Sequence, residues 1–530
     1  MSVQTAMDRM ESRVDSPPWS FGLAGVISVG LLYGLVYSGL RLSISHNLAT
    51  DDVLSNVYAQ SLELGYIGRQ PPLYEWLLWL VQRFTGPTLL SFLILKYSLL
   101  AATFVFLYLV AKRVFADPRW ATLAALSPLM LYQIGWNVHE GGGVTQTGVL
   151  MCAVAASTWA IMRLVERGTT GDYLLFGLIA GLGLISKYSF AGFLFVLLAS
   201  ALLQPALRAR ILNQRMFVGI GVGAAVTAPI VYWLITKHYD LVDLYNSSIA
   251  PMAKTDWFQA RAIGLGKAIY APLAFLFPLD AIVVFFPGVL HEGWSAIRKG
   301  ATLRAVDRDQ LDWQLLLLRV TLGGFIVLLL GAVATGATHY LERYMHPFFL
   351  LTPLWLLGLV EKSGNASRRL AILASVFVAV TLLVVPLRLY ALLHGMGPEC
   401  RRCRIAVPYH GLAAALEARG FHSGTIIAAD RDDAGNLRRI FPEARIVRLG
   451  PLSYAPLLRA ADFSSKVAVV WRKGTVSGVP KEAKGELARV AGNVTAAPER
   501  VSIPWRSYPP TSVERVWEWV IVVADPGPKE

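Results

Sequence analysis

Long, uninterrupted apolar runs are the feature that most limits how these 530 residues can fold. A helix that crosses the hydrocarbon core of a bilayer needs about 20 mostly apolar residues, because its backbone groups must bond within the segment. Runs near that length lie at about residues 21–43, 88–111, 120–134, 144–162, 173–186, 189–203, 216–236, 268–289, 314–337, 346–360 and 370–392. We therefore predict an all-α polytopic membrane protein with about 11 transmembrane helices.

The composition supports a membrane protein and excludes several other classes. The chain is 55% hydrophobic and 16% charged, whereas an average globular domain is about 25% charged. Disorder and a coiled coil are incompatible with these values. The net charge of +14 lies between the apolar runs, so it reflects membrane topology, and we expect no nucleic-acid partner.

Three local patterns refine the assignment of spans. The runs 173–186 and 189–203 are short and are joined only by Lys187 and Tyr188, so a re-entrant or tilted hairpin is an alternative to two full spans. Residues 1–20 form a polar leader without a small-residue cleavage site, which indicates a membrane anchor. Gly219, Gly221 and Gly223 lie within a run, where small residues serve helix packing.

The distribution of Lys and Arg predicts the orientation. With the N-terminus inside, the inner loops carry about twice as many Lys and Arg residues as the outer loops. We therefore predict a cytoplasmic leader at 1–20, a transmembrane domain at 21–392 and an outer tail at 393–530. The outer loops are then 44–87, 135–143, 237–267 and 338–345.

The tail from 393 to 530 differs in character from the rest of the chain. It is charged and turn-rich, and its pattern predicts a helix at 412–419 and strands at 424–429, 467–471 and 516–523. We expect a small extramembrane α/β domain. No glycine-rich phosphate loop begins any of its helices.

The three cysteines exclude a disulfide scaffold. Cys152 lies in an apolar run, which favours a packing role. Cys400 and Cys403 form a Cys-x-x-Cys pair, for which a redox site or half a zinc site are alternatives. Because no second pair completes a zinc site, we expect a small disulfide if this region faces an oxidising compartment.

The first outer loop contains the most informative polar residues. Asp51 and Asp52 follow the first span, and apolar residues at helical spacing come after them, which predicts an interfacial helix. One alternative is that an aspartate caps this helix. The other is that one carboxylate is catalytic, and the two roles can be divided between the pair.

Further polar groups are expected on the same side of the membrane. Arg69 and Gln70 precede a Pro-Pro pair and an aromatic stretch, so Arg69 is a candidate for binding a lipid phosphate or for anchoring at headgroups. His139 and Glu140 adjoin three glycines and are candidates for binding an acceptor, a sugar or a metal, with a plain connector as the alternative. Lys96 lies within a span, so we expect it to face a polar cavity or a carboxylate.

These motifs together resemble the membrane glycosyltransferases that use polyprenyl-phosphate sugars. The acidic pair is followed by Ala-Gln-Ser-Leu-x-x-Gly-Tyr at 59–66 and Gln-Pro-Pro-Leu-Tyr-x-Trp at 70–76. Lys187-Tyr188 resembles the family's Leu-x-Lys-Tyr stretch, and Arg343-Tyr344 its Arg-Tyr-x-x-Pro. The superfamily includes protein O-mannosyltransferases and the aminoarabinose transferase of lipid A, and the bacterial lipopolysaccharide-core galacturonosyltransferases are the most similar branch. The resemblance covers roughly residues 20–360.

The resemblance implies a C-type glycosyltransferase fold in the bacterial inner membrane. It implies an inverting transfer at the outer face, from a polyprenyl-phosphate sugar to a lipopolysaccharide-core or lipid A acceptor. Asp51 maps to the catalytic base, and Asp52 stands where many relatives carry Glu. Lys187, Tyr188, Arg343 and Tyr344 become substrate-binding candidates by this mapping. Aminoarabinose transferases carry Glu-Lys where this chain has Arg69 and Gln70, so the phosphate-binding cation has moved to Arg69 or is lost.

Two questions stay open on the sequence. No spacing specifies a metal site, so a divalent cation is neither required nor excluded, and no other cofactor is indicated. A polytopic lipid or glycan transporter is the alternative function. Transporters place polar groups near the bilayer midplane and often have internal repeats, and we find no repeat. The gathering of polar residues at one face therefore favours an enzyme.

Overall fold

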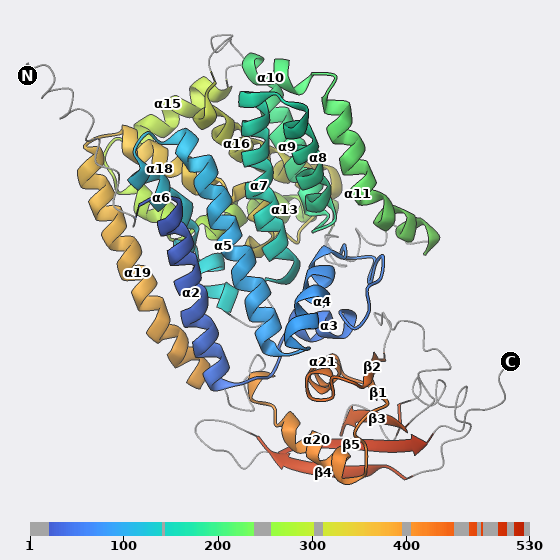
Figure 1. The fold of residues 1–530 in the computed structure, drawn as a ribbon. Coiled ribbons are helices and arrows are strands. Elements are labelled where there is room, and N and C mark those ends of the chain that lie inside the picture. Colours follow the sequence, from blue (N-terminus) through green and yellow to red (C-terminus); the bar gives the residue numbers. More distant parts are fainter. Residues whose placement is uncertain are drawn as a thin grey trace, which may run out of the picture.

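The computed structural model describes residues 21–139, 144–237, 256–301, 311–394, 404–449, 466–473, 479–480, 497–505 and 514–523. This part of the chain is mostly helical, and a small sheet near its C-terminal end lies beside one end of the helical bundle (Figure 1). The predicted fold class is confirmed at this level. The helices, however, are not divided as the apolar runs suggest.

Six helices in the described ranges are long and apolar enough to cross a membrane. They are α2 (Leu23–Ile44), α5 (Leu89–Val114), α7 (Thr145–Arg167), α11 (Met216–Thr236), α16 (Trp313–Thr335) and α19 (Ala366–His394). The predicted hairpin forms α8 (Thr170–Leu184) and α9 (Ser189–Leu202), and α9 bends by 119° into α10 (Pro205–Ile211). The structure thus supports six spans, or seven if the bent pair counts as one, and the expected number of about 11 is not confirmed.

Prolines explain why several apolar runs are broken into short helices. Proline fits the first turn of a helix and is disfavoured in its interior, because it lacks an N–H. Pro128, Pro278 and Pro353 each stand at such a break. The resulting elements are α6 (Pro118–Leu126), η1 (Ser127–Met130), η2 (Tyr132–Trp136), η3 (Asn137–His139), α13 (Trp257–Leu276), α14 (Leu279–Val284), α15 (Val289–Ala301), α17 (His346–Phe349) and α18 (Thr352–Lys362).

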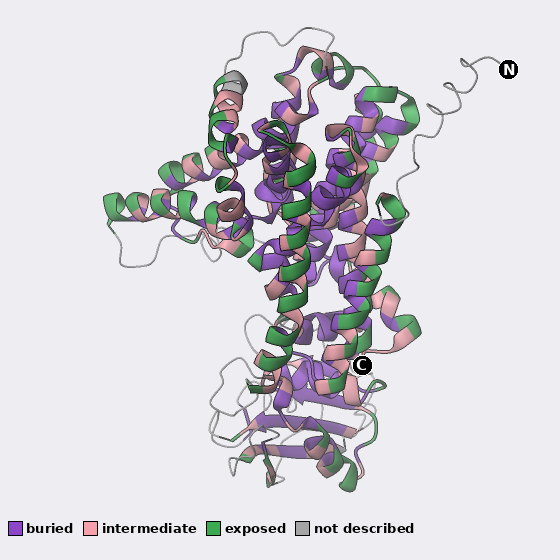
Figure 2. Ribbon diagram, turned by 90° about the vertical axis from the view of Figure 1, so that its left-hand side faces the viewer, coloured by how far each residue is buried: buried purple, intermediate pink, exposed green. Residues whose placement is uncertain are grey.

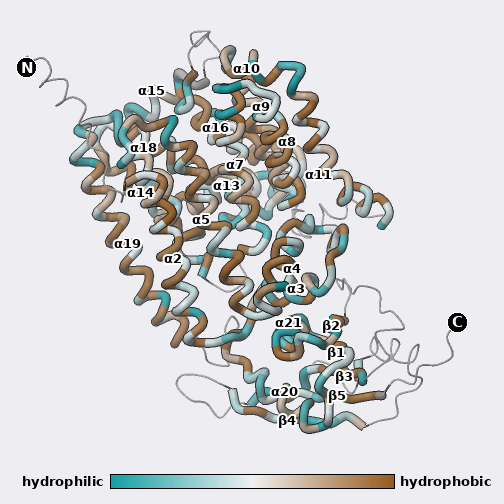
Figure 3. Tube along the Cα trace, in the orientation of Figure 1, coloured by the Kyte–Doolittle hydropathy of each residue, from teal (hydrophilic) through white to brown (hydrophobic). Residues whose placement is uncertain are grey.

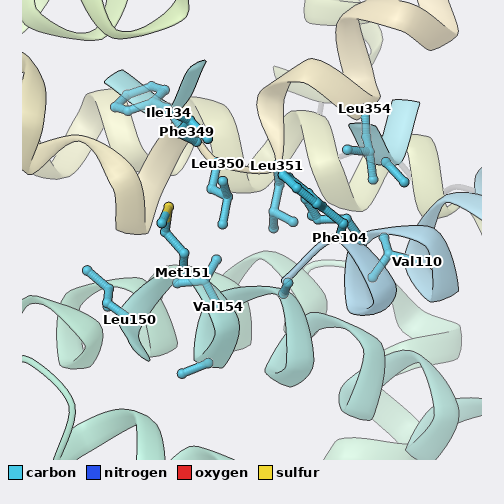
Figure 4. Close-up of a cluster of buried hydrophobic side chains, with 14 of the residues drawn as sticks. Phe104, Val110, Ile134, Leu150, Met151, Val154, Phe349, Leu350, Leu351 and Leu354 are labelled. Carbon is cyan, nitrogen blue, oxygen red and sulfur yellow. The ribbon is translucent and has the colours of Figure 1, made fainter. Parts of the chain in front are cut away.

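The core of the bundle is formed by α5, α7, α17 and α18. Phe104, Met151, Leu350 and Leu354 are buried in it, and Figure 4 shows such side chains pointing toward one another from separate helices. The outer faces of α2 and α19 are exposed instead (Figure 2), and the same helices are strongly apolar along their length (Figure 3). An exposed apolar surface of this kind is suited to contact with lipid tails.

Glycines let α8 and α11 pack closely, as the sequence predicts. A Cβ on Gly177 would lie 2.1 Å from the carbonyl oxygen of Gly219. A Cβ on Gly181 would lie 3.1 Å from the Cα of Gly223. In a membrane the hydrophobic effect does not drive helices together, because lipid tails are as apolar as the side chains. Small residues instead let the helix backbones approach and pack closely. The packing role is therefore confirmed for Gly219 and Gly223, whereas nothing lies within 4 Å of a Cβ added at Gly221. Cys152 lies half-buried in α7 and forms no disulfide.

The C-terminal region is a small α/β domain. Its predicted helix and three predicted strands are present, and one helix and two strands are added to them. Its elements are η5 (Arg404–Ala406), α20 (Tyr409–Ala418), β1 (Thr425–Ala428), α21 (Arg431–Ile440), β2 (Arg445–Arg448), β3 (Lys466–Arg472), β4 (Glu499–Pro504) and β5 (Glu514–Val523). The sheet order is β2-β1-β3-β5-β4, with the first three strands parallel and β5 antiparallel to both its neighbours. Cys400 and Cys403 lie outside the described residues, so their disulfide stays a prediction.

The helix α21 docks this domain on the loop that contains the two aspartates. That loop forms α3 (Asp51–Tyr58) and α4 (Leu73–Thr85), which lie between the bundle and α21 (Figure 1). The Asn436 side chain accepts from the Leu48 N–H at 2.8 Å and donates to its carbonyl at 3.1 Å. Gly435 lies so close that an added Cβ would be 2.3 Å from the Val53 carbonyl oxygen. The loop is therefore held from both sides.

Candidate active site

The two aspartates are the first residues of α3. Thr50 occupies the position before the helix, has φ 54, and makes no capping hydrogen bond with its side chain. Neither aspartate is therefore the N-cap residue, but both lie in the first turn, where their charge complements the helix dipole as expected. Consecutive helical residues point about 100° apart. As a result Asp51 is exposed while Asp52 is 2% exposed and faces the bundle.

Asp51 lies beside residues from two distant loops. Lys187 interacts electrostatically with Asp51 and with Arg343. The Lys187 ammonium lies 5.7 Å from the centre of the Tyr344 ring, and the Arg343 guanidinium lies 5.2 Å from the same ring. Tyr188 is the neighbour of Lys187 on its loop. We call Asp51, Lys187, Tyr188, Arg343 and Tyr344 the Asp51 cluster; all five were predicted from the sequence.

Hydrogen bonds tie the predicted phosphate-binding loop to this cluster. The Tyr188 hydroxyl donates to the Gly68 carbonyl at 2.8 Å, and the Leu73 N–H donates to the Ile185 carbonyl at 3.2 Å. Arg69 and Gln70 lie between these two bonds, with Arg69 exposed and Gln70 half-buried. The structure thus brings the 68–73 loop and the 185–188 loop together, as a shared site requires.

Burial tunes the charge of Lys187. Burial lowers the pKa of Lys187 to about 8, with Arg343 lowering it further and Asp51 opposing the shift. The ammonium donates to the Thr147 hydroxyl at 3.1 Å. At neutral pH Lys187 is mostly protonated, so the cluster presents two cations beside an exposed carboxylate. Such an arrangement can hold an anionic leaving group next to a base.

Asp52 faces a different environment, a pocket among the ends of α2, α5 and α19. We call it the Asp52 pocket. It is lined by Tyr37, Leu40, Arg41, Asp52, Leu89, Leu93, Lys96, Tyr97, His139, Arg388 and Leu392. Lys96 was expected to face a polar cavity or a carboxylate partner, and its place here beside Asp52 confirms that expectation.

Three tyrosines surround His139. The Tyr33 hydroxyl lies 2.6 Å from Nε2 and the Tyr97 hydroxyl 2.9 Å from Nδ1, while the Tyr37 ring stacks on the imidazole at 3.5 Å. Burial, with Lys96 and Arg388 nearby, holds the pKa of His139 well below its usual range. A neutral imidazole has one donor and one acceptor nitrogen, and both are used here. Both ring nitrogens are therefore engaged in this structure. The role of His139 in binding an acceptor, a sugar or a metal stays a prediction, and Glu140 lies outside the described residues.

Metal ligands do not gather elsewhere in the described ranges. No group of three or more His, Cys, Asp or Glu side chains there is placed to hold an ion. The sequence specified no such site either.

Glu75 is a buried acid that the sequence pattern did not single out. It accepts hydrogen bonds from the Ser55 hydroxyl at 3.1 Å and the Gln146 amide at 2.7 Å. Burial raises the pKa of Glu75 to about 7, although both hydrogen bonds favour the charged form. It links α4 to α3 and to the start of α7. Its place in an aromatic stretch suggested contact with the interface, whereas its side chain points inward.

Arg41 and Arg388 are the other functional candidates that the sequence pattern did not single out. Both lie within or at the edge of apolar runs. An arginine inside a spanning segment is itself a signal, because a buried charge in the membrane is costly and calls for a function. An arginine of this kind is visible in both apolar runs. Arg41 and Arg388 are two of the three cations that line the Asp52 pocket, and Lys96 is the third.

Comparisons with known proteins show which families and proteins this chain is similar to. Residues 69–233 match the family described as dolichyl-phosphate-mannose-protein mannosyltransferase. The lipopolysaccharide core galacturonosyltransferases RgtA and RgtB of Rhizobium johnstonii (strain DSM 114642 / LMG 32736 / 3841) are 28% and 27% identical to the chain. The RgtA match covers 82% of this chain and 83% of RgtA, and the RgtB match covers 92% and 94%.

A solved structure has the same fold. ArnT from Cupriavidus metallidurans bound to undecaprenyl phosphate superposes with a TM-score of 0.54 and 13% sequence identity, over 93% of this chain and 98% of that one. The match extends through the C-terminal domain as well as the bundle. The ArnT likeness shows the fold, and the family match with the galacturonosyltransferase relatives shows that this membrane protein is a glycosyltransferase.

Proposed function

We propose that this glycosyltransferase moves a sugar from a polyprenyl-phosphate donor to a lipopolysaccharide-core or lipid A acceptor, with Asp51 as the general base. The observation that carries the proposal is the Asp51 cluster, in which an exposed carboxylate lies beside Lys187 and Arg343. The named relatives act on lipopolysaccharide core, and a similar fold binds undecaprenyl phosphate. These comparisons support the choice of donor and acceptor class.

The cluster suggests a direct displacement. The Asp51 carboxylate takes the proton of an acceptor hydroxyl, and the resulting oxygen forms a bond to the anomeric carbon of the sugar. The bond from that carbon to the phosphate oxygen breaks on the opposite face, and its electron pair leaves with the polyprenyl phosphate. Lys187 and Arg343 stabilise the charge that grows on the departing phosphate. The configuration at the anomeric carbon is inverted.

The remaining predicted residues position the donor in this scheme. Tyr188 holds the 68–70 loop, from which the exposed Arg69 can reach a lipid phosphate. The Tyr344 ring contacts both Lys187 and Arg343 by cation–π interactions. These contacts hold the two cations near each other and leave both charged. We place this site at the outer face of the bacterial inner membrane, with the N-terminus inside, on the charge bias of the loops.

A transporter is disfavoured as the alternative. The relatives are galacturonosyltransferases, and the cations of the Asp52 pocket gather at one end of α2, α5 and α19. A transport path through the bundle would need polar groups distributed across it.

The test compares Asp51→Asn with Asp52→Asn in membranes supplied with polyprenyl-phosphate sugar and native acceptor. A general base contributes about 10²–10⁴-fold to a rate, so Asp51→Asn should lose at least 100-fold, on that scale, while donor binding persists. Asp52→Asn, which alters a buried charge outside the Asp51 cluster, should lose less. If Asp52→Asn is inactive but folded and Asp51→Asn turns over normally, Asp52 is the base. Activity in both variants would remove the catalytic role from this loop.

A further inference from the structure

Glu75 is a buried carboxylate that has no role in the proposed reaction so far. It lies in the first turn of α4 and is 3% exposed. The side chains that donate to it, those of Ser55 and Gln146, are both neutral. Burial is the main influence on its pKa, and hydrogen bonds rather than charged neighbours oppose that influence. A carboxylate buried in this way costs stability, and such groups are frequent where a function requires them.

The bond to Ser55 holds the helix that carries Asp51. Ser55 is 2% exposed, and its hydroxyl donates to Oε1 of Glu75 at 3.1 Å. Residues four apart lie on the same side of a helix, so Ser55 stands one turn from Asp51 on α3. Within an α-helix the N–H of a residue also bonds to the carbonyl four residues earlier. A shift of Ser55 is therefore passed to the backbone of Asp51 within a single turn.

The bond to Gln146 leads to Lys187. The Gln146 amide nitrogen donates to the same Oε1 of Glu75 at 2.7 Å, and its oxygen accepts from the Thr145 hydroxyl at 2.5 Å. Both ends of this amide are thereby fixed. The next residue, Thr147, accepts a hydrogen bond from the Lys187 ammonium at 3.1 Å. Glu75 thus holds the first turn of α7, to which the ammonium is bonded.

The backbone of α4 makes a third connection. The N–H of Leu73, two residues before Glu75, donates to the carbonyl of Ile185 at 3.2 Å. Ile185 lies two residues before Lys187. The 185–188 loop is therefore attached to α4 directly, and to α7 through Thr147. Glu75 lies where α3, α4 and the start of α7 come together (Figure 1).

We propose that Glu75 is a positioning residue that sets the spacing between Asp51 and Lys187. This inference rests on the proposed function, in which Asp51 takes the acceptor proton and Lys187 stabilises the departing phosphate. One carboxylate oxygen accepts from both sides, so it fixes the two groups relative to each other. A charged acceptor forms stronger hydrogen bonds than a neutral one. Such a contact suits a reacting centre, where a misplacement of about 1 Å can cost about 100-fold in rate.

Transfer kinetics of single variants separate the two connections. Ser55→Ala removes the donor on the Asp51 side and should lower kcat by about tenfold, with a parental donor KM. Gln146→Leu removes the support of Thr147 and should instead raise the donor KM by about tenfold. Glu75→Leu removes both bonds and should show both effects. If Glu75→Leu does not fold, the two other variants still decide the proposal.

Two controls match these changes in kind. Ser127→Ala and Gln204→Leu remove a buried serine hydroxyl and a buried glutamine amide, each of which bonds to a backbone carbonyl outside the Asp51 cluster. Both should keep the parental kcat and donor KM. Equal kinetics for Ser55→Ala and Ser127→Ala, or for Gln146→Leu and Gln204→Leu, would overturn the proposal.

Conservative and double variants distinguish positioning from stability. Glu75→Gln keeps an oxygen that can accept both bonds, so its kcat should stay within about tenfold of the parental value. In the Glu75→Leu background Ser55→Ala should cause no further loss, because the bond it removes is already absent. Additive losses in the double variant, or a folded Glu75→Gln enzyme as impaired as Glu75→Leu, would contradict a positioning role.

Binding of undecaprenyl phosphate gives a measurement that does not depend on transfer. In native mass spectrometry of the purified full chain, Gln146→Leu should weaken this binding by about tenfold, and Ser55→Ala should leave it unchanged. Equal binding by Gln146→Leu and the parent would remove the connection to Lys187. Normal turnover by Asp51→Asn would count against the proposed function instead, while the binding result still judges how Glu75 positions Lys187.

Discussion

Adding one methyl group at Gly435 should disable the active site from a distance. Gly435 lies in the first half of α21, and a Cβ added there would be 2.3 Å from the Val53 carbonyl oxygen and 2.5 Å from the Val53 Cα. Non-bonded carbon contacts are relaxed at about 3.5–4.0 Å, and both atoms are backbone of α3 rather than a flexible side chain. In Gly435→Ala the two helices must therefore separate by about 1 Å.

The expected magnitude follows from that displacement. Overpacking typically costs about 1–3 kcal/mol, which most folded proteins survive. A misplacement of about 1 Å at a reacting group can cost about 100-fold in rate, and Asp51 lies two residues before Val53. We expect Gly435→Ala to remain folded, with a kcat lower by about 100-fold and a donor KM close to that of the parent.

The assay pairs transfer kinetics with thermal unfolding in detergent. Gly266→Ala is the matched control, because Gly266 is also helical and nothing lies within 4 Å of its added Cβ. It should keep the parental rate, with equal or slightly higher Tm, since alanine favours helix over glycine. A folded Gly435→Ala enzyme with the parental rate would refute the view that α21 positions α3.

Other predictions concern protonation and topology. Lys187→Arg should remove the fall in transfer rate that the parent shows as pH rises through about 8, because a guanidinium stays protonated there; an unchanged alkaline limb would assign that fall to another group. Burial raises the pKa of Glu75 from 4.5 to about 7, so its stabilising protonated form is fully present below pH 4.5 and lost as pH rises through about 7. Glu75→Gln should match the parent in free energy of unfolding at low pH and exceed it at pH 8, by about 3 kcal/mol at most; a parent that gains stability relative to this variant as pH rises would contradict the assignment. Alkaline phosphatase fused after residue 395 should be active, and activity of a cytoplasmic reporter at the same point would reverse the topology.

The sequence predicted the acidic loop and its partners better than it predicted the spans. Asp51, Lys187, Arg343 and Tyr344 do lie together, and the resemblance of their motifs to one family was the reason to expect it. The number of spans is not confirmed, partly because hydropathy does not register where proline ends a helix inside an apolar run. Pro128 and Pro278 were visible in the sequence, but their effect depends on which neighbouring helix completes the break.

The internal organisation of the site was less accessible. Helix geometry separates Asp51 from Asp52, but only the packing of α3 shows which of them is exposed. His139 was considered a ligand because a histidine beside glycines is typical of binding loops, whereas three tyrosines from α2 and α5 engage it. Contacts between α21 and α3 join residues almost 400 positions apart, with a separation of 388 for Asn436 and Leu48. No local pattern reports such a pairing.

That separation also orders events during synthesis. A ribosome adds about 5–20 residues per second, so the acidic loop emerges early in synthesis. The α21 residues that contact this loop emerge only when the chain is nearly finished. A nascent polypeptide can thus insert its helices and fold its bundle while α3 still lacks Asn436, Gly435 and Arg438 against it. Catalytic competence would then arrive last, after the helices are in place, and products of premature termination would populate the membrane as folded but inactive bundles.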